Sequence, residues 1–385
     1  MRRVMVVFGT RPEAIKLAPL VLALNGHDRL EPITTVTAQH RQMLDQVLDV
    51  FGVVPDDDLD ILRPGQTLVD ITTRALAGLV DAIERRRPDA VVVQGDTTTA
   101  FAGALAAFYS GVPVAHVEAG LRSGDITAPF PEEMNRRLTT QLTALHLAPT
   151  PSARANLLAE GVPRPAVVVT GNTVIDALRW AVARDVPFTT PALTDLDGDD
   201  RPVLLVTAHR RESWGAGMRD IAGSLREIAE AEPGLLVVFP IHPNPMVRDT
   251  IIPATAGLPN VRIIEPLGYG EFARLIARST LILTDSGGLQ EEGPSVGKPV
   301  LVMRDVTERP EAVESGNVAL VGTDPSRIVG SVLRLLRQPP EYARMAGAVN
   351  PYGDGRAVER CVGALLHLLD GDPPPDEFDP ETPIG

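Results

Sequence analysis

Cysteine, lysine and aromatic residues are scarce in this chain of 385 residues. Cys361 is the single cysteine, which excludes an intrachain disulfide and a thiolate metal site and suits a reducing compartment. Two lysines, Lys16 and Lys298, stand among 36 basic residues, so arginine supplies the cation at every other basic position. Unless both lysines survive by chance, they mark positions where a compact ammonium group fits better than a guanidinium.

Basic residues are also few relative to acidic ones. Acidic residues outnumber basic ones by 50 to 36, which gives a net charge of −14. Nucleic-acid binding neutralises phosphates with a basic face, so this balance argues against such a partner. No apolar run approaches the roughly 18 residues of a membrane span, and the run Val4–Phe8 is too short for a signal peptide. We therefore expect a cytoplasmic protein with no membrane partner.

The chain does contain short β-branched runs that alternate with longer amphipathic segments, which is typical of parallel α/β layers. The sequence predicts an α/β fold of two doubly wound, Rossmann-like domains that face a cleft at the carboxyl ends of their strands. We place the first domain at 1–172 and the second at 173–354. A last helix at about 355–370 is expected to pack back on the first domain. Residues 371–385 are rich in proline and acidic side chains and predict a disordered tail.

Ten strands are expected from these runs. Those of the first domain are Val4–Phe8, Ile33–Thr37, Ala90–Gln94, Pro113–Val117 and Leu145–Ala148. Those of the second are Val203–Thr207, Leu235–Pro240, Val261–Ile264, Leu281–Thr284 and Pro299–Val302.

The turn after the strand Leu281–Thr284 contains the stronger of two anion-site signals. Ser286, Gly287 and Gly288 end this strand and open a helix. Glycines let backbone N–H groups approach a diphosphate closely, and the serine hydroxyl adds a donor. A glutamate one turn later could accept hydrogen bonds from both hydroxyls of a ribose. The alternative is an ordinary N-cap at Ser286, with Glu291 and Glu292 favouring the first helical turn.

The turn after the first strand is the second anion-site signal. Its sequence, G-T-R-P-E-A-I-K from residue 9, is neither a dinucleotide fingerprint nor a Walker loop. Pro12 suits a first helical turn, so Arg11 stands at a helix N-terminus, where the dipole favours an anion. Alternatively, Arg11 and Lys16 are solvated surface charges.

Two histidines follow strands of the predicted second domain. His209 begins the segment H-R-R-E, and His242 begins H-P-N-P. At strand ends both would face the cleft, although a lone histidine is more often a hydrogen-bonded structural residue.

Three carboxylates fall at or just beyond strand ends of the predicted first domain. Asp96 lies in Q-G-D-T-T-T, Glu118 in H-V-E-A-G-L-R, and Glu132 in P-F-P-E-E-M-N-R. Converging carboxylates raise one another's pKa, so one can act as an acid while another acts as a base. Alternatively, Asp96 is only an N-cap and Glu132 only a first-turn residue. No H-x-x-H or H-E-x-x-H spacing supports a metal site.

Taken together, the motifs resemble those of the bacterial non-hydrolysing UDP-N-acetylglucosamine 2-epimerases. In addition to the segments quoted above, the chain contains D-S-G-G-L-Q-E-E and T-E-R-P-E, and the ordered set spans residues 9 to 311. The resemblance implies the two-domain glycosyltransferase-B architecture and a homodimer. It also implies interconversion of UDP-GlcNAc and UDP-ManNAc without a redox cofactor or metal.

The resemblance also assigns roles to individual residues. The implied catalytic residues are Asp96, Glu118, Glu132, Lys16 and His209. The implied UDP site consists of Arg11, His209, Ser286, Gly287, Gly288, Glu292 and Arg309, with Glu292 on the ribose. A second, activating UDP-GlcNAc would bind at Gln39, His40, Gln66, Arg211 and His242.

Three departures from the family pattern bear on these roles. Ala38 stands where glycine is usual, and Arg137 replaces a common glutamine; the resemblance places both near the activator site. Gly293 replaces alanine, which removes a methyl group near the ribose-binding glutamate and could alter the sugar nucleotide accepted.

Other functions stay open at this point. A glycosyltransferase of the same architecture would share the Ser-Gly-Gly site but would not need three carboxylates together. A nucleotide-sugar-binding regulator without activity should have lost Asp96, Glu118, Glu132 or His209, and all four are present. A hydrolysing epimerase is disfavoured by the segment Gln39-His40.

Overall fold

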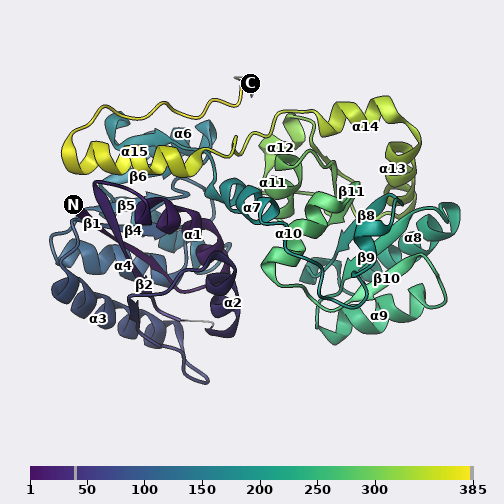
Figure 1. The fold of residues 1–385 in the computed structure, drawn as a ribbon, viewed down its shortest axis with the longest axis horizontal. Helices are drawn as coiled ribbons and strands as arrows, with labels where there is room; N and C mark the ends of the chain where they lie inside the picture. Colours follow the sequence, from purple (N-terminus) through teal and green to yellow (C-terminus); the bar gives the residue numbers. More distant parts are fainter. Residues whose placement is uncertain (39–40, 382–385) are drawn as a thin grey trace. The chain divides into compact units, whose positions relative to one another are not determined.

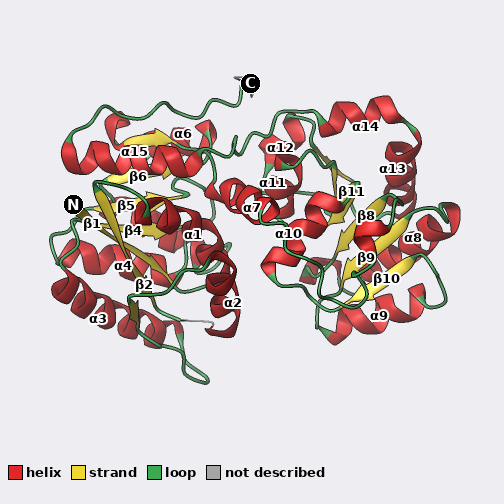
Figure 2. Cartoon of the chain, in the orientation of Figure 1, coloured by secondary structure: helices red, strands yellow, loops and turns green. Residues whose placement is uncertain are grey.

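The computed structural model describes residues 1–38 and 41–381, which form two compact units. The first unit comprises Met1–Trp180 and Tyr352–Gly385, and the second comprises Ala181–Pro351. Each is a parallel sheet covered by helices, as Figure 1 and Figure 2 show. The division therefore falls within helix α7 (Thr173–Ala183), after the boundary predicted at residue 172.

The first unit contains a seven-stranded sheet in the order β3-β2-β1-β4-β5-β6-β7. Its strands are β1 (Arg2–Phe8), β2 (Leu30–Val36), β3 (Asp57–Asp58), β4 (Ala90–Gln94), β5 (Val114–Val117), β6 (Leu145–Ala148) and β7 (Val167–Val169). Its helices, besides α7, are α1 (Arg11–Asn25), α2 (Arg41–Phe51), α3 (Leu68–Arg86), α4 (Thr98–Tyr109), α5 (Glu132–Leu142), α6 (Pro151–Ala159) and α15 (Ala357–Asp370).

The second unit contains a six-stranded sheet in the order β10-β9-β8-β11-β12-β13. Its strands are β8 (Val203–Thr207), β9 (Leu236–Pro240), β10 (Val261–Ile264), β11 (Leu281–Thr284), β12 (Val300–Val302) and β13 (Val318–Leu320). Its helices are α8 (Ala216–Ala231), α9 (Pro245–Thr255), α10 (Tyr269–Arg278), α11 (Leu289–Ser295), α12 (Pro310–Glu314), α13 (Pro325–Arg337) and α14 (Pro339–Ala346).

The central strands are apolar because helices cover both faces of each sheet. Residues 4–8 of β1 and 203–206 of β8 are fully buried, as expected for parallel strands without a solvent-facing side. Every strand predicted from the sequence is present, and the α/β prediction of two Rossmann-like domains is confirmed. The strands β3, β7 and β13 were not predicted, because two or three residues are too few to show a period.

Strand order brings the motif-bearing turns of each unit together. In the first sheet, β1 and β5 flank β4, so the turns after these three strands emerge side by side. In the second sheet, β8 pairs with β11, and Thr207 lies opposite Thr284 at their carboxyl ends. These two edges carry nearly all the candidate site residues. No helix in the described part of the chain is long and apolar enough to cross a bilayer.

The prediction of a disordered tail is wrong for residues 371–381. The backbone N–H of Phe378 donates to the carbonyl of Val169 at 2.8 Å, at the edge strand β7. The Glu377 carboxylate accepts from both Arg154 and Arg164 at 2.8 Å. Composition suggested disorder because the segment is polar, but one aromatic anchor and an ion-pair cluster are enough to hold it along α15 and β7.

Replacing Phe378 with alanine should destabilise the first unit by about 2–4 kcal/mol, because its ring is buried and lies under the Arg360 guanidinium. Urea unfolding measures the loss. Val54→Ala is the control, since that side chain is 84% exposed in the same unit. Equal stability of both variants would show that the tail contributes nothing to the fold.

Candidate functional site

Glu118 is buried at the carboxyl end of β5, in a left-handed backbone conformation with φ of 63°. Its Oε1 lies 2.5 Å from Lys16 Nζ and 3.0 Å from Asn172 Nδ2, and its Oε2 accepts from the Gln94 amide. One of the two lysines therefore pairs with a predicted catalytic carboxylate. A carboxylate held by three donors has a fixed position from which it can exchange a proton with a ligand.

Asp96 lies in the neighbouring turn, after β4. Its carboxylate pairs with Arg136, and its backbone carbonyl accepts from the Asn135 side chain at 3.0 Å, so α5 is docked on this turn. Burial raises the pKa of Asp96, the Arg136 charge opposes that rise, and the Glu118 charge adds to it. The two carboxylates are thus electrostatically coupled, and Asp96 keeps its proton to higher pH than an ordinary aspartate.

Glu13 joins the turns after β1 and β4. Its fully buried carboxylate accepts from the backbone N–H groups of Gly9 and Thr10, at 3.0 and 2.8 Å, and from the Thr97 hydroxyl at 2.6 Å. Burial raises the pKa of Glu13, and these donors oppose the rise. The contacts fix the chain on both sides of Arg11, which heads α1.

Of the three predicted carboxylates, Glu132 is the one that the structure does not join to the others. It is half-buried at the start of α5, and no hydrogen bond or ion pair of its side chain is found among the described residues. The next residue, Glu133, is fully buried and pairs with Arg136 and Arg137. Sequence reasoning missed Glu133 and Arg136, although Arg136 follows Glu132 by four residues, about one helical turn, and contacts Asp96.

The second unit carries the other half of the candidate residues. His209 follows β8 and Asp285 follows β11, and the His209 Nδ1 lies 2.9 Å from the Asp285 Oδ1. Asp285 was not singled out from the sequence, although it directly precedes Ser286 in the predicted anion site. Pairing of β8 with β11 explains why the two residues meet.

The Ser-Gly-Gly turn lies beside two guanidinium groups. A Cβ atom added to Gly287 would stand 3.6 Å from Arg309 Cζ and 3.7 Å from Arg210 Nη2. Arg309 is held by Glu291, whose Oε1 accepts from its Nε at 2.8 Å. Two cations beside an open glycine turn can bind an anion at close range.

The structure separates the roles of the two adjacent glutamates. Glu291 is buried on Arg309, whereas Glu292 is half-buried, and its Oε2 would be 3.2 Å from a Cβ on Gly288. Glu292 therefore lies next to the Ser286–Gly288 turn, where the family resemblance puts the ribose.

Gly293 faces the sheet rather than the ligand side of this turn. A Cβ there would meet Val300 Cγ2 at 2.6 Å and Ile282 Cδ1 at 2.9 Å. The expectation that its missing methyl group alters sugar specificity has no support in these contacts. The glycine instead allows α11 to pack closely on β11 and β12.

Gly293→Ala should therefore destabilise the second unit by about 1–3 kcal/mol through overpacking. Gly223→Ala in α8 is the matched control, because nothing lies within 4 Å of its added Cβ and alanine favours a helix. Denaturant unfolding of both variants measures the difference. An unchanged midpoint for Gly293→Ala would contradict the close packing.

The residues implied for an activator site are only partly placed. Gln39 and His40 lie outside the described residues. Gln66 accepts from the Arg63 backbone N–H at 2.9 Å, and the guanidinium carbon of Arg211 lies 5.9 Å from the centre of the Trp214 ring. His242 stacks on His209, with ring centroids 5.9 Å apart, so it adjoins a residue of the implied UDP site.

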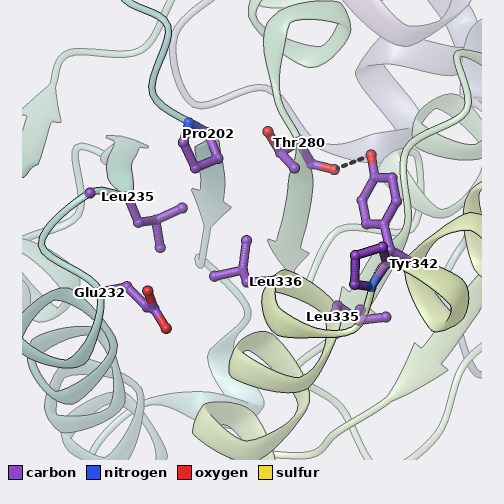
Figure 3. A pocket seen from close by; sticks show the side chains of 9 residues that line it. Pro202, Glu232, Leu235, Thr280, Leu335, Leu336 and Tyr342 are labelled. Atoms are coloured by element: carbon purple, nitrogen blue, oxygen red, sulfur yellow. Dashed lines mark hydrogen bonds between the residues drawn. The ribbon is translucent and has the colours of Figure 1, made fainter.

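Within residues 1–38 and 41–381, no group of three or more His, Cys, Asp or Glu side chains could hold a metal ion. A hollow of about 480 Å³ lies in the second unit at the amino ends of its strands, where Tyr342 donates to the Thr280 carbonyl at 3.0 Å (Figure 3). That edge is opposite His209 and Asp285.

Comparisons with known proteins agree on one family. The sequence model described as UDP-N-acetylglucosamine 2-epimerase matches residues 22–366. UDP-N-acetylglucosamine 2-epimerase of Yersinia pestis is 53% identical over 371 residues, which are 94% of this chain and 98% of the relative. The Escherichia coli K12 protein of the same name is 51% identical over 376 residues, again 94% and 98% of the two chains.

Solved structures give the same result. UDP-GlcNAc 2-epimerase from Neisseria meningitidis, bound to UDP-GlcNAc, has a TM-score of 0.83 at 47% identity and covers 94% of this chain and 99% of its own. The Staphylococcus aureus MnaA structure with UDP has a TM-score of 0.86 at 46% identity, and covers 98% and 100%.

Proposed function

The chain belongs to the UDP-N-acetylglucosamine 2-epimerase family, and from that premise we propose that it interconverts UDP-GlcNAc and UDP-ManNAc by inverting C2 without hydrolysis. One observation of the site carries the proposal. Two carboxylates at neighbouring strand ends of the first unit are coupled, the half-buried Asp96 with a raised pKa and the buried Glu118 paired with Lys16. Such a pair can hold a proton on one group while the other accepts one.

The proposed mechanism is elimination followed by re-addition. The C2–H bond lies next to no carbonyl, so simple enolisation is unavailable. A base removes the C2 proton while the C1–O bond breaks and UDP leaves, which gives 2-acetamidoglucal. UDP then adds back to C1 as a proton is delivered to the opposite face of C2, so atoms and charge balance over the cycle.

We assign the proton transfers to the first unit and the diphosphate to the second. Asp96 and Glu118 carry out the proton transfers at C2, and Lys16 lies beside them. Glu132 is included among the catalytic residues on the family resemblance alone. Departure of UDP places charge on the diphosphate. Donors fixed around it in advance stabilise that transition state, since they need no reorganisation as the charge develops. Their identities follow the resemblance: Arg11, His209, Ser286, Gly287, Gly288 and Arg309, with Glu292 on the ribose.

The alternatives predict other products. A glycosyltransferase would transfer the sugar to an acceptor, and a hydrolysing epimerase would release UDP and free ManNAc. The coupled carboxylates Asp96 and Glu118 favour the epimerase over the glycosyltransferase, because sugar transfer needs no proton exchange at C2.

Proton NMR of UDP-GlcNAc with the purified protein in D₂O tests the function. UDP-ManNAc should appear with deuterium at C2, because the group that delivers a proton to the opposite face exchanges its own proton with solvent. Product that keeps its original C2 hydrogen would contradict the elimination mechanism. Free ManNAc as the first product would instead indicate hydrolysis.

We also propose a cytoplasmic homodimer that a second UDP-GlcNAc activates. The resemblance supports both, and the exposed Phe108 and Tyr109 on α4 offer apolar surface for a partner copy. Light scattering measures the assembly. A sigmoidal dependence of rate on UDP-GlcNAc that disappears in Gln66→Ala would support the activator site.

A further inference from the structure

One buried carboxylate holds the backbone of His209 and lies against its ring. Asp285 is 0% exposed, and its Oδ2 accepts from the backbone N–H groups of His209 and Arg210, at 2.7 and 2.8 Å. Its Oδ1 lies 2.9 Å from the ring Nδ1 of His209. This contact does not meet hydrogen-bond geometry, and the buried Oδ1 has no other hydrogen-bond partner among the described residues, so a proton on Nδ1 is what would satisfy it. Nε2 is then the ring nitrogen left for a ligand, and the His209 side chain is 38% exposed.

We propose that Asp285 is a positioning residue that keeps the neutral His209 ring protonated on Nδ1 and stabilises its imidazolium form, whose Nε2–H donates to the departing diphosphate. This inference rests on the proposed function, which places that diphosphate beside His209. Asp285 itself transfers no proton, since a buried carboxylate in this position acts by orienting the ring and stabilising its charge.

The neighbouring charges agree with this arrangement. Burial alone would raise the pKa of Asp285, but the His209 ring and the two backbone donors outweigh it and lower that pKa. The pKa of His242 is lowered by burial, by the His209 charge and by Arg248. A neutral His242 therefore covers one face of His209 without opposing its charge. Asp285 is then the carboxylate that faces the imidazolium.

Selective ¹⁵N labelling of the histidines in the full-length protein tests the tautomer directly. The His209 signals are assigned as those that disappear in His209→Gln. In the wild type, the neutral ring should carry its proton on Nδ1. In Asp285→Asn the amide can donate to Nδ1, so the proton should move to Nε2. Asp249→Asn, an exposed aspartate of the same unit, is the control and should leave the ring unchanged.

Kinetics distinguishes this role from simple support of the loop. Asp285→Asn should lower kcat by about tenfold while KM and the affinity for UDP change less than about threefold. If Asp285 acts through His209, adding Asp285→Asn to His209→Gln should reduce kcat less than about threefold further. If the reduction of kcat in the double variant equals the product of the reductions in the two single variants, the proposal is overturned.

The ¹⁵N spectrum of the wild type alone shows which nitrogen of His209 carries the proton, even where a variant does not fold. A neutral His209 ring protonated on Nε2 in the wild type would overturn the inference. A protein that shows the Asp285-dependent tautomer but epimerises nothing would contradict the proposed function, while the positioning of the ring by Asp285 would stand.

Discussion

Glu118→Gln should slow C2 epimerisation by about 10²–10⁴-fold, the range expected when a positioned acid–base group is removed. The change keeps the shape of the side chain but removes its ability to accept a proton. The Glu118 carboxylate accepts from three donors, Lys16 Nζ, Asn172 Nδ2 and the Gln94 amide. The side-chain NH₂ group of the glutamine would therefore face other donors instead of an acceptor. Turnover is measured by NMR at saturating UDP-GlcNAc.

A measurement of UDP binding shows whether Glu118→Gln loses the proton-transfer step or the nucleotide site. The residues assigned to the nucleotide lie in the second unit, apart from Arg11, so UDP affinity measured by calorimetry should change less than about threefold. Glu84→Gln, an exposed carboxylate of the first unit, is the matched control and should keep full activity. Turnover of Glu118→Gln within about threefold of the wild type would remove Glu118 from the proton transfers.

The same variant should change the pH dependence in a defined direction. Burial raises the pKa of Asp96, and the Glu118 charge raises it further, against the Arg136 charge. Removing the Glu118 charge should therefore lower the pKa of Asp96. A ¹³C carboxylate titration should find that Asp96 loses its proton at lower pH in the variant than in the wild type.

Gly287→Val should weaken UDP binding by about a hundredfold or more, which corresponds to about 2.7 kcal/mol. The added Cβ alone would lie in ordinary contact with Arg309 and Arg210, at 3.6 and 3.7 Å. Two further methyl groups would occupy the space between these guanidinium groups or the path of the diphosphate. Calorimetric titration with UDP measures the loss.

Two comparisons make this result specific. Gly287→Ala should lose less affinity than Gly287→Val, because its Cβ meets no clash within the protein. Gly234→Val adds the same bulk to the second unit at a position with nothing within 4 Å of the new Cβ, and UDP affinity should be unchanged. Normal UDP binding by Gly287→Val would move the diphosphate away from the Ser-Gly-Gly turn.

The sequence determined the fold class because its signals are local. Continuous apolar runs such as Val4–Phe8 and Val203–Thr207 require burial on both faces, which only parallel strands under two helical layers provide. It also placed most candidate residues at strand ends, and the order of motifs was sufficient to indicate the family. The tail was misread because composition does not report one buried contact, that of Phe378.

Only the tertiary structure decided which of these residues work together. Asp285 and His209 are 76 residues apart in the chain, and pairing of β8 with β11 brings them together. Lys16 and Glu118 are likewise 102 residues apart, and the order β1-β4-β5 joins their turns. Local patterns predict which residues lie at a strand end, but a side chain's partners depend on strand order. For that reason the sequence alone could not single out Asp285, Glu133 or Arg136.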